Sequence, residues 1–230
     1  MPPMPRKARS TGPGLRPDGT VDDPTLRRQL RRLGRLYPDA DCALVHANPY
    51  ELLIATILSA QTTDKAVNKV TPVLFSRYPN PQDLANARLE DIESIIRTIG
   101  FYRTKAKNIR GAARGLVERF GGQVPDRLED LVTLPGVARK TANVVLGVAF
   151  GKAEGIVVDT HVLRLSNRLG FVRAKTPAQA ERQLMARIPK RRWIRLSHQL
   201  IWHGRRVCKA RRPACDDCAL APDCPSAQVG

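Results

Sequence analysis

The sequence predicts an all-α protein, and three observations support that fold class. Apolar residues recur at helical spacing along most of the 230-residue chain. Capping residues and glycines mark the points where many of these segments start and stop. No segment has a convincing strand pattern, since the one candidate, GIVVDT at residues 155–160, is too short to carry a sheet. A hydrophobic content of 42% is sufficient for one large domain or two small ones.

The first helices are predicted by their capping residues as well as by their apolar residues. In DDPTLRRQLRRLGRLYP, Asp23 is the expected N-cap and Pro24 the first helical residue. The next segment, NPYELLIATILSAQ, is almost entirely apolar, which predicts a helix at the centre of a core. Thr62 or Thr63 then caps a helix over DKAVNKVTPVLFSRY, and Gln61 lies at the junction between these two helices.

The remaining helices are delimited mainly by glycine. Gly100, Gly121 and Gly170 each follow a segment of helical periodicity and are expected to end its helix. Thr176 is the expected N-cap of a late helix. The segments of this part of the chain that we expect to be helical are 89–99, 104–120, 126–134, 137–148, 158–169, 176–188 and 191–207.

The charge of the chain indicates a polyanionic partner. It has 39 Lys and Arg against 21 Asp and Glu, a formal charge of +18. Ten of the basic residues lie between Arg187 and Arg212 without one acid among them, which argues against a mere surplus for solubility. No apolar run approaches the roughly 20 residues that a membrane span needs, so nucleic acid is favoured over membrane.

The N-terminal segment, residues 1–21, is basic and rich in proline and glycine, and it has no apolar stretch of the signal-peptide type. We therefore expect a disordered basic tail. We also expect an intracellular protein, cytoplasmic and associated with the nucleoid, in a compartment that keeps thiols reduced.

Four of the five cysteines form the pattern C-x6-C-x2-C-x5-C, namely Cys208, Cys215, Cys218 and Cys224. Four thiolates within such a short segment can surround one metal centre. Zinc and a [4Fe–4S] cluster both fit four cysteines, and the spacing alone leaves both open. Cys42 is far away in sequence and is interpreted as a small buried hydrophobic residue.

The loop between the first two of these cysteines is strongly basic. Its sequence KARRPA contains Lys209, Arg211 and Arg212. Whichever metal holds it, this loop is suited to contact phosphates.

The segment LPGVARKTANVV indicates a helix-hairpin-helix. A Pro-Gly turn ahead of a helix N-terminus presents backbone N–H groups and the positive end of the helix dipole to a phosphate. Lys140 lies in the first turn of that helix, beside Arg139. It is either a further phosphate contact or a nucleophile, and a nucleophilic amine requires a desolvated site in addition to the helix dipole. Asp159 is either the N-cap of the next helix or a carboxylate that assists such a lysine.

These motifs together resemble the endonuclease III family of DNA repair glycosylases. The resemblance rests on L-P-G-V-x-R-K-T-A-N-V-V, on V-D-T-H-V and on the cysteine pattern, in that order. It extends through LSAQTTDKAVNKV and IRTIGFYRTKAKNI, and covers roughly residues 22 to 226.

The resemblance implies two all-helical domains with the DNA in a cleft between them. A six-helix barrel domain with the helix-hairpin-helix would span residues 42–152. A [4Fe–4S] cluster domain would combine residues 22–41 with residues 153–230, so that the family favours the iron–sulfur cluster over zinc. We expect a monomer.

The resemblance also assigns roles to single residues. Lys140 matches the nucleophile of the family and Asp159 its catalytic aspartate. Gln61 and Phe101 match positions that enter the duplex when the damaged base is flipped out, and His161 is a candidate beside the catalytic aspartate or a packing residue. The remaining residues expected at the DNA are Gly136, Ala138, Arg139, Lys209, Arg211 and Arg212, of which Ala138 stands where the family usually has glycine.

The function implied is that of a base excision repair enzyme, a bifunctional DNA N-glycosylase and AP lyase. It would remove damaged, above all oxidised, pyrimidines from double-stranded DNA and cut 3′ to the abasic site by β-elimination. A pyrimidine-dimer glycosylase on the same scaffold and a noncatalytic redox-sensing DNA-binding protein are the alternatives. The related adenine glycosylases lack a lysine at the position of Lys140.

Overall fold

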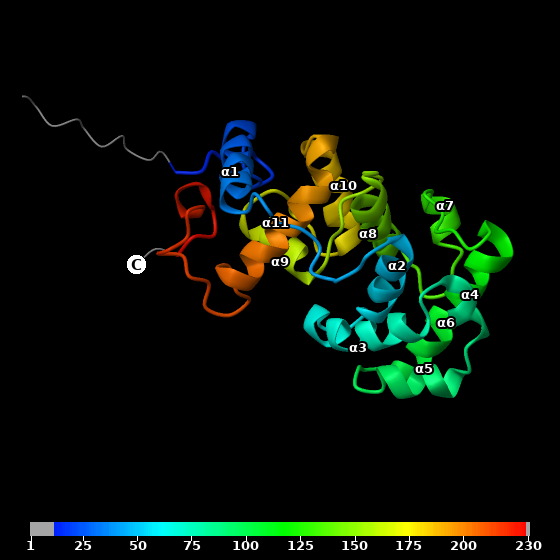
Figure 1. The fold of residues 1–230 in the computed structure, drawn as a ribbon. Helices are drawn as coiled ribbons and strands as arrows, with labels where there is room; N and C mark the ends of the chain where they lie inside the picture. The colour runs from blue at the N-terminus through cyan, green and yellow to red at the C-terminus, as the bar shows by residue number, and fades with distance from the viewer. Residues whose placement is uncertain (1–11, 229–230) are drawn as a thin grey trace, which may run out of the picture. The chain divides into compact units, whose positions relative to one another are not determined.

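The computed structural model describes residues 12–228, and within them the chain is helical, as predicted (Figure 1). The only β-type pairing in this range is an isolated bridge between Leu15 and Val21. The chain divides into two compact units. We call residues 42–155 the central unit, and the chain up to Asp41 together with the chain from Ile156 the cysteine unit.

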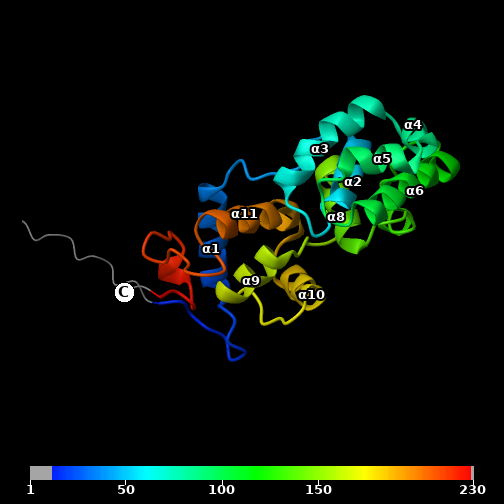
Figure 2. The same cartoon turned by 90° about the horizontal axis from the view of Figure 1, so that it is seen from below.

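The central unit is built around α2, Pro49–Leu58, which is buried along nearly its whole length. It packs on α3, α6 and α8. Helices α4 and α5 both pack on α6, and α4, α5 and α6 lie side by side in both views (Figures 1 and 2). The apolar sequence of α2 therefore does form the centre of a core, as predicted. The other helices of this unit are α3 (Asp64–Arg77), α4 (Pro81–Asn86), α5 (Leu89–Ile96), α6 (Tyr102–Phe120), α7 (Leu128–Leu131) and α8 (Arg139–Phe150).

The cysteine unit combines a helix from the N-terminal part of the chain with helices from its C-terminal part. Its α1, Asp23–Leu36, packs on α11, Trp193–Arg206, and α11 packs on α9, Thr160–Arg168. A second apolar core, with Leu33 and Phe171 among its fully buried members, fills the unit. Its other helical elements are α10 (Pro177–Arg187) and the short 3-10 helices η1 (Lys190–Arg192) and η2 (Ala221–Asp223).

The structure corrects the predicted start of the first helix. The N-cap of α1 is Asp22 and not Asp23, because the Asp22 carboxylate accepts the bond from the Thr25 N–H, 2.8 Å away. Thr63 and Thr176 are caps, as predicted. Helix α4 was not predicted, since its six residues are too few to show a helical period.

The expectation of disorder over residues 1–21 is wrong for the part that the structure describes, residues 12–21. Val21 is fully buried, and its N–H donates to the Gly170 carbonyl, 2.8 Å away. These contacts join segments far apart in sequence, so that the local composition did not reveal them. Residues 1–11 lie outside the described range.

Candidate active site

The helix-hairpin-helix is formed by α7, α8 and the turn between them. Gly136 has a φ of 77°, a left-handed conformation that favours glycine. A Cβ at this position would lie 2.9 Å from the Cβ of Asn108, so that the turn also has no space for a side chain. The Val137 N–H closes the turn on the Leu134 carbonyl, 3.1 Å away.

The hairpin turn is seated against α6 at two glycines one helical turn apart. A Cβ at Gly111 would lie 3.1 Å from Pro135, and a Cβ at Gly115 would lie 2.7 Å from Leu134. These glycines let the turn approach the helix closely, which fixes the start of α8.

Lys140 lies in the first turn of α8, and its side chain is exposed. The helix starts at Arg139, one residue after the N-cap Ala138, whose φ of −87° and ψ of 169° are extended. The prediction that the helix includes Val137 and Ala138 is therefore wrong. No side chain caps this N-terminus, and both Arg139 and Lys140 stand exposed beside it. The arrangement is suited to bind an anion.

Asp159 is the N-cap of α9. Its Oδ1 accepts a hydrogen bond from the N–H of Val162, 2.7 Å away, and the residue is half-buried. The preceding Ile156 and Val158 are buried in the core of the cysteine unit and anchor the segment that carries the carboxylate.

Gln61 and Phe101 both lie at exposed turns of the central unit. Gln61 has a φ of 51° and Phe101 a φ of 59°, and such left-handed conformations are uncommon for residues other than glycine. Phe101 is the N-cap of α6 and is 67% exposed, a large fraction for an aromatic side chain. The two positions that the resemblance assigns to duplex entry are thus available to solvent.

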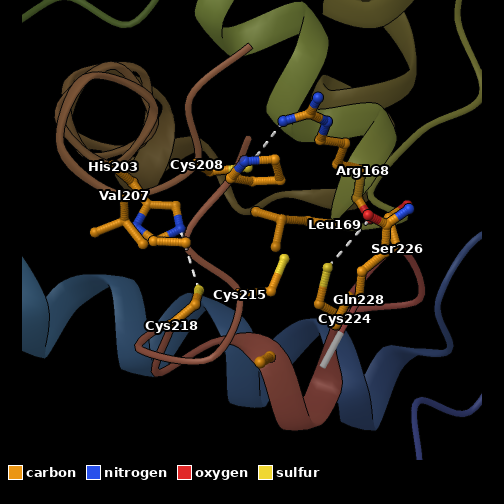
Figure 3. Close-up of a pocket in the computed structure, with 14 residues that line it drawn as sticks. Arg168, Leu169, His203, Val207, Cys208, Cys215, Cys218, Cys224, Ser226 and Gln228 are labelled. Atoms are coloured by element: carbon orange, nitrogen blue, oxygen red, sulfur yellow. Dashed lines mark hydrogen bonds between the residues drawn. The ribbon is translucent and has the colours of Figure 1, made fainter. Parts of the chain in front are cut away.

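The four clustered cysteines line one cavity of about 230 Å³ (Figure 3). Cys208 lies after α11, Cys215 and Cys218 lie on the following loop, and Cys224 follows η2. All four cysteines are among the residues that form the wall of this cavity.

The thiols of this cavity are partly shielded from water. Burial raises the pKa of Cys218 and raises that of Cys224 to about 11. A raised pKa means that the protonated thiol is favoured. A bound metal reverses this preference, because a coordinating thiol is deprotonated. The spacing predicts these four cysteines as ligands of one metal centre, and all four line the same cavity.

Lys209, Arg211 and Arg212 are exposed on the loop between Cys208 and Cys215. Arg168 of α9 holds the base of this loop, donating to the carbonyl of Lys209 at 2.7 Å and to that of Ala210 at 2.9 Å. It also donates to Cys208 Sγ, 3.4 Å away. Nothing in the local sequence pattern distinguishes this arginine from other helical arginines, so the sequence alone does not predict its role.

A second missed anchor of the cysteine segment is Asp223. It is 3% exposed, and its carboxylate binds Arg28 at 2.8 Å and Arg32 at 2.7 Å. Both arginines belong to α1, so that the N-terminal helix fixes η2 close to Cys224. The spacing of Arg28 and Arg32 by four residues is the one sequence signal that pointed to a shared partner.

His161 is the second residue of α9, and its side chain packs against α11. Its Nδ1 is 3.2 Å from the guanidinium of Arg164, which also donates to the carbonyls of Gly204 and Cys208. The ring of His161 thus lies beside Arg164 within the cysteine unit.

None of the helices in residues 12–228 is both long enough and apolar enough to span a lipid bilayer.

Comparison with known proteins gives consistent matches. Residues 54–190 match the HhH-GPD superfamily base excision DNA repair protein family. The chain is 57% identical over 197 residues to endonuclease III of Synechocystis sp., covering 86% of this chain and 90% of that protein. Identity to endonuclease III of Bacillus subtilis is 48% over 200 residues, covering 86% and 91%. A solved trapped endonuclease III–DNA covalent intermediate, an estranged-adenine complex, matches with a TM-score of 0.85 and 47% identity, covering 90% of this chain and 97% of that chain.

Proposed function

The chain belongs to the endonuclease III family within the HhH-GPD superfamily of base excision DNA repair proteins, and from that premise we propose which residues carry its reaction. It is a DNA glycosylase with AP lyase activity, and its partner is DNA with a damaged base. The two other functions considered, a pyrimidine-dimer glycosylase and a noncatalytic redox sensor, are not favoured.

Lys140 is the nucleophile of the proposed mechanism. The observation that carries this role is its position, an exposed amine in the first turn of a helix that follows a turn suited to bind an anion. A phosphate held at that N-terminus would bring the sugar of the lesion to the amine. Bound DNA would also exclude water from an amine that is exposed without it, and this desolvation favours the neutral, attacking form.

The chemistry proceeds through a covalent sugar adduct. The Nζ of Lys140 attacks C1′ of the flipped nucleotide, the bond from C1′ to the base breaks, and the base departs with a proton. The nitrogen supplies that proton, and its lone pair then expels O4′ from C1′, so that the sugar ring opens, O4′ takes up a proton to become a hydroxyl, and a protonated Schiff base joins the lysine to C1′. Removal of a C2′ proton then expels the 3′ phosphate, and hydrolysis frees the lysine. Asp159 stabilises the cationic sugar and carries protons, for which its half-buried carboxylate is suited.

Damaged pyrimidines, and oxidised ones above all, are the proposed substrates. Gln61 and Phe101 would fill the space that a flipped nucleotide leaves in the duplex, a role supported by their exposure. Gly136, Ala138 and Arg139 would hold a backbone phosphate at the start of α8. Lys209, Arg211 and Arg212 would add phosphate contacts on the cysteine unit. His161 is assigned to packing and not to DNA contact.

We propose a [4Fe–4S] cluster as the cofactor, held by Cys208, Cys215, Cys218 and Cys224. Four thiols that line one cavity suit a cluster in which each iron takes one cysteine. The membership of the chain in the endonuclease III family supports the cluster over a single zinc ion, which four cysteines could also hold. The cluster would fix the basic loop in place, a structural role.

The proposed substrate class is tested with duplex oligonucleotides that each contain one modified base. We expect strand cleavage at an oxidised pyrimidine and at an abasic site, and none at a normal base. Cleavage at an abasic site with no release of any oxidised pyrimidine would overturn the proposed substrate class.

A further inference from the structure

Lys105 on α6 is the one lysine among the described residues whose side chain is buried, with 4% exposure. Its Nζ donates to Oγ1 of Thr62, 2.5 Å away, and within residues 12–228 this is the only polar contact of the ammonium. Burial lowers the pKa of Lys105. A charged group buried against a single neutral acceptor disfavours folding, so that simple packing does not account for a lysine here. The geometry around it suggests a functional reason.

Lys105 contacts both turns that carry the residues assigned to duplex entry. Its backbone N–H donates to the carbonyl of Phe101, 3.0 Å away, as part of the first turn of α6. Its side chain reaches Thr62, the residue directly after Gln61. One residue thus connects the Phe101 turn through its backbone and the Gln61 turn through its side chain.

Thr62, which accepts the hydrogen bond from Lys105, also makes two hydrogen bonds on the other side of Gln61. The Thr62 hydroxyl donates in turn to the carbonyl of Ala60, 3.4 Å away, and the Thr62 N–H donates to the carbonyl of Ser59 at 3.0 Å. The polar contacts of Thr62 therefore close the turn across Gln61. Both Gln61 and Phe101 have left-handed backbones, which persist only where surrounding contacts hold them.

We propose that Lys105 is a positioning residue that fixes the Gln61 turn and the Phe101 turn relative to each other, so that both side chains enter the duplex together at the lesion. This inference rests on the proposed function. It assigns no chemical step to Lys105, whose ammonium acts through the hydroxyl of Thr62.

The proposal predicts a defect that depends on base pairing. Unstacking and unpairing the damaged base is most difficult in an intact pair and easiest where the base is already unpaired. The test therefore compares single-turnover base release from one oxidised pyrimidine opposite its normal partner with release opposite an abasic analogue. Lys105→Met keeps the aliphatic stem and removes the donor, and Thr62→Val removes the acceptor. Each should lower the rate on the paired lesion at least about fivefold and the rate on the unpaired lesion by less than about twofold.

Two control variants separate positioning from loss of charge and from loss of fold. Lys107→Met removes the same charge from an exposed site on the same helix, and it should leave the ratio of the two rates unchanged. Thr62→Ser keeps the hydroxyl, so the ratio of its rates on the paired and the unpaired lesion should equal that of the wild type. An equal loss on both substrates by Lys105→Met would indicate a general structural role and overturn the proposal.

A coupled variant tests whether Lys105 acts through Gln61 and Phe101. In a Gln61→Ala, Phe101→Ala background, Lys105→Met should hardly lower the rate of base release from the paired lesion any further, since the side chains that Lys105 positions are gone. A full additional fivefold loss there would overturn the proposal. Failure of the wild type to release any damaged base would instead contradict the proposed function, which keeps the two failures distinct.

Discussion

The carboxylate of Asp159 caps α9, with its Oδ1 2.7 Å from the backbone nitrogen of Val162. The proposed catalytic carboxylate therefore also stabilises the helix that follows it. One side chain has two roles, and substitutions can separate them.

Asp159→Asn should slow base release and leave α9 intact, because asparagine is as good an N-cap as aspartate but has no charge to stabilise a cationic sugar. Asp159→Ala should show the same chemical defect and a further loss of about 1 kcal/mol in the free energy of unfolding. Urea denaturation and single-turnover kinetics of the two variants measure these effects. Full activity of Asp159→Asn would remove this residue from the mechanism.

Lys140→Gln should abolish strand cleavage and the adduct trapped by borohydride, while damaged DNA still binds. A lysine that only contacts phosphate would instead lose affinity and keep its turnover on saturating DNA. Gel-shift titration and borohydride trapping distinguish these outcomes, with Lys152→Gln, on an exposed lysine after α8, as the control. Adduct formation by Lys140→Gln at near-normal yield would identify another amine as the nucleophile.

Replacement of Lys209, Arg211 and Arg212 by Gln should weaken binding to every DNA sequence alike and flatten its salt dependence, because phosphate contacts release counterions. The matched control removes three exposed arginines that are paired with acids in the central unit, Arg77, Arg88 and Arg127. Fluorescence anisotropy over a range of salt concentrations measures the slope. An equal change in both triple variants would show that net charge, and not this loop, is responsible.

The protein isolated without added metal should contain about four irons per chain and absorb in the visible range, as expected for a [4Fe–4S] centre. Cys215→Ser should lower the iron content and Cys42→Ser should not, because Cys42 packs against the core of the central unit and is not among the residues that line the cysteine cavity. Metal analysis of the three proteins provides the measurement. Stoichiometric zinc without iron would contradict the cofactor assignment.

The unfolding free energy should depend on pH through Lys105. Burial lowers the pKa of this amine below its ordinary 10.5, so between the two values the unfolded chain holds a proton that the native protein has lost. The stability of the wild type therefore rises with pH through that interval. Lys105→Met lacks the titrating group, so its stability relative to the wild type should fall as pH rises from neutral toward about 10. Denaturation of both proteins across this range tests the sign, and a constant difference would contradict it.

The sequence by itself determined the helical class and the positions of the chemical groups along it. Periodicity and caps such as Thr63 and Thr176 are readable because helical hydrogen bonds join residues three or four apart. The Pro-Gly turn, Lys140 behind it and the four spaced cysteines belong to the same local kind of information.

Only the tertiary structure decided the contacts that hold these groups in place. Lys105 meets Thr62 across 43 residues, and Asp223 meets Arg28 across 195. Val21 is ordered by Gly170, although its own neighbourhood is rich in proline, glycine and charge. Such pairs form when distant helices pack, and no local pattern encodes which side chains will face each other. The sequence therefore determined which residues are available for chemistry, and packing decided which neighbours position them.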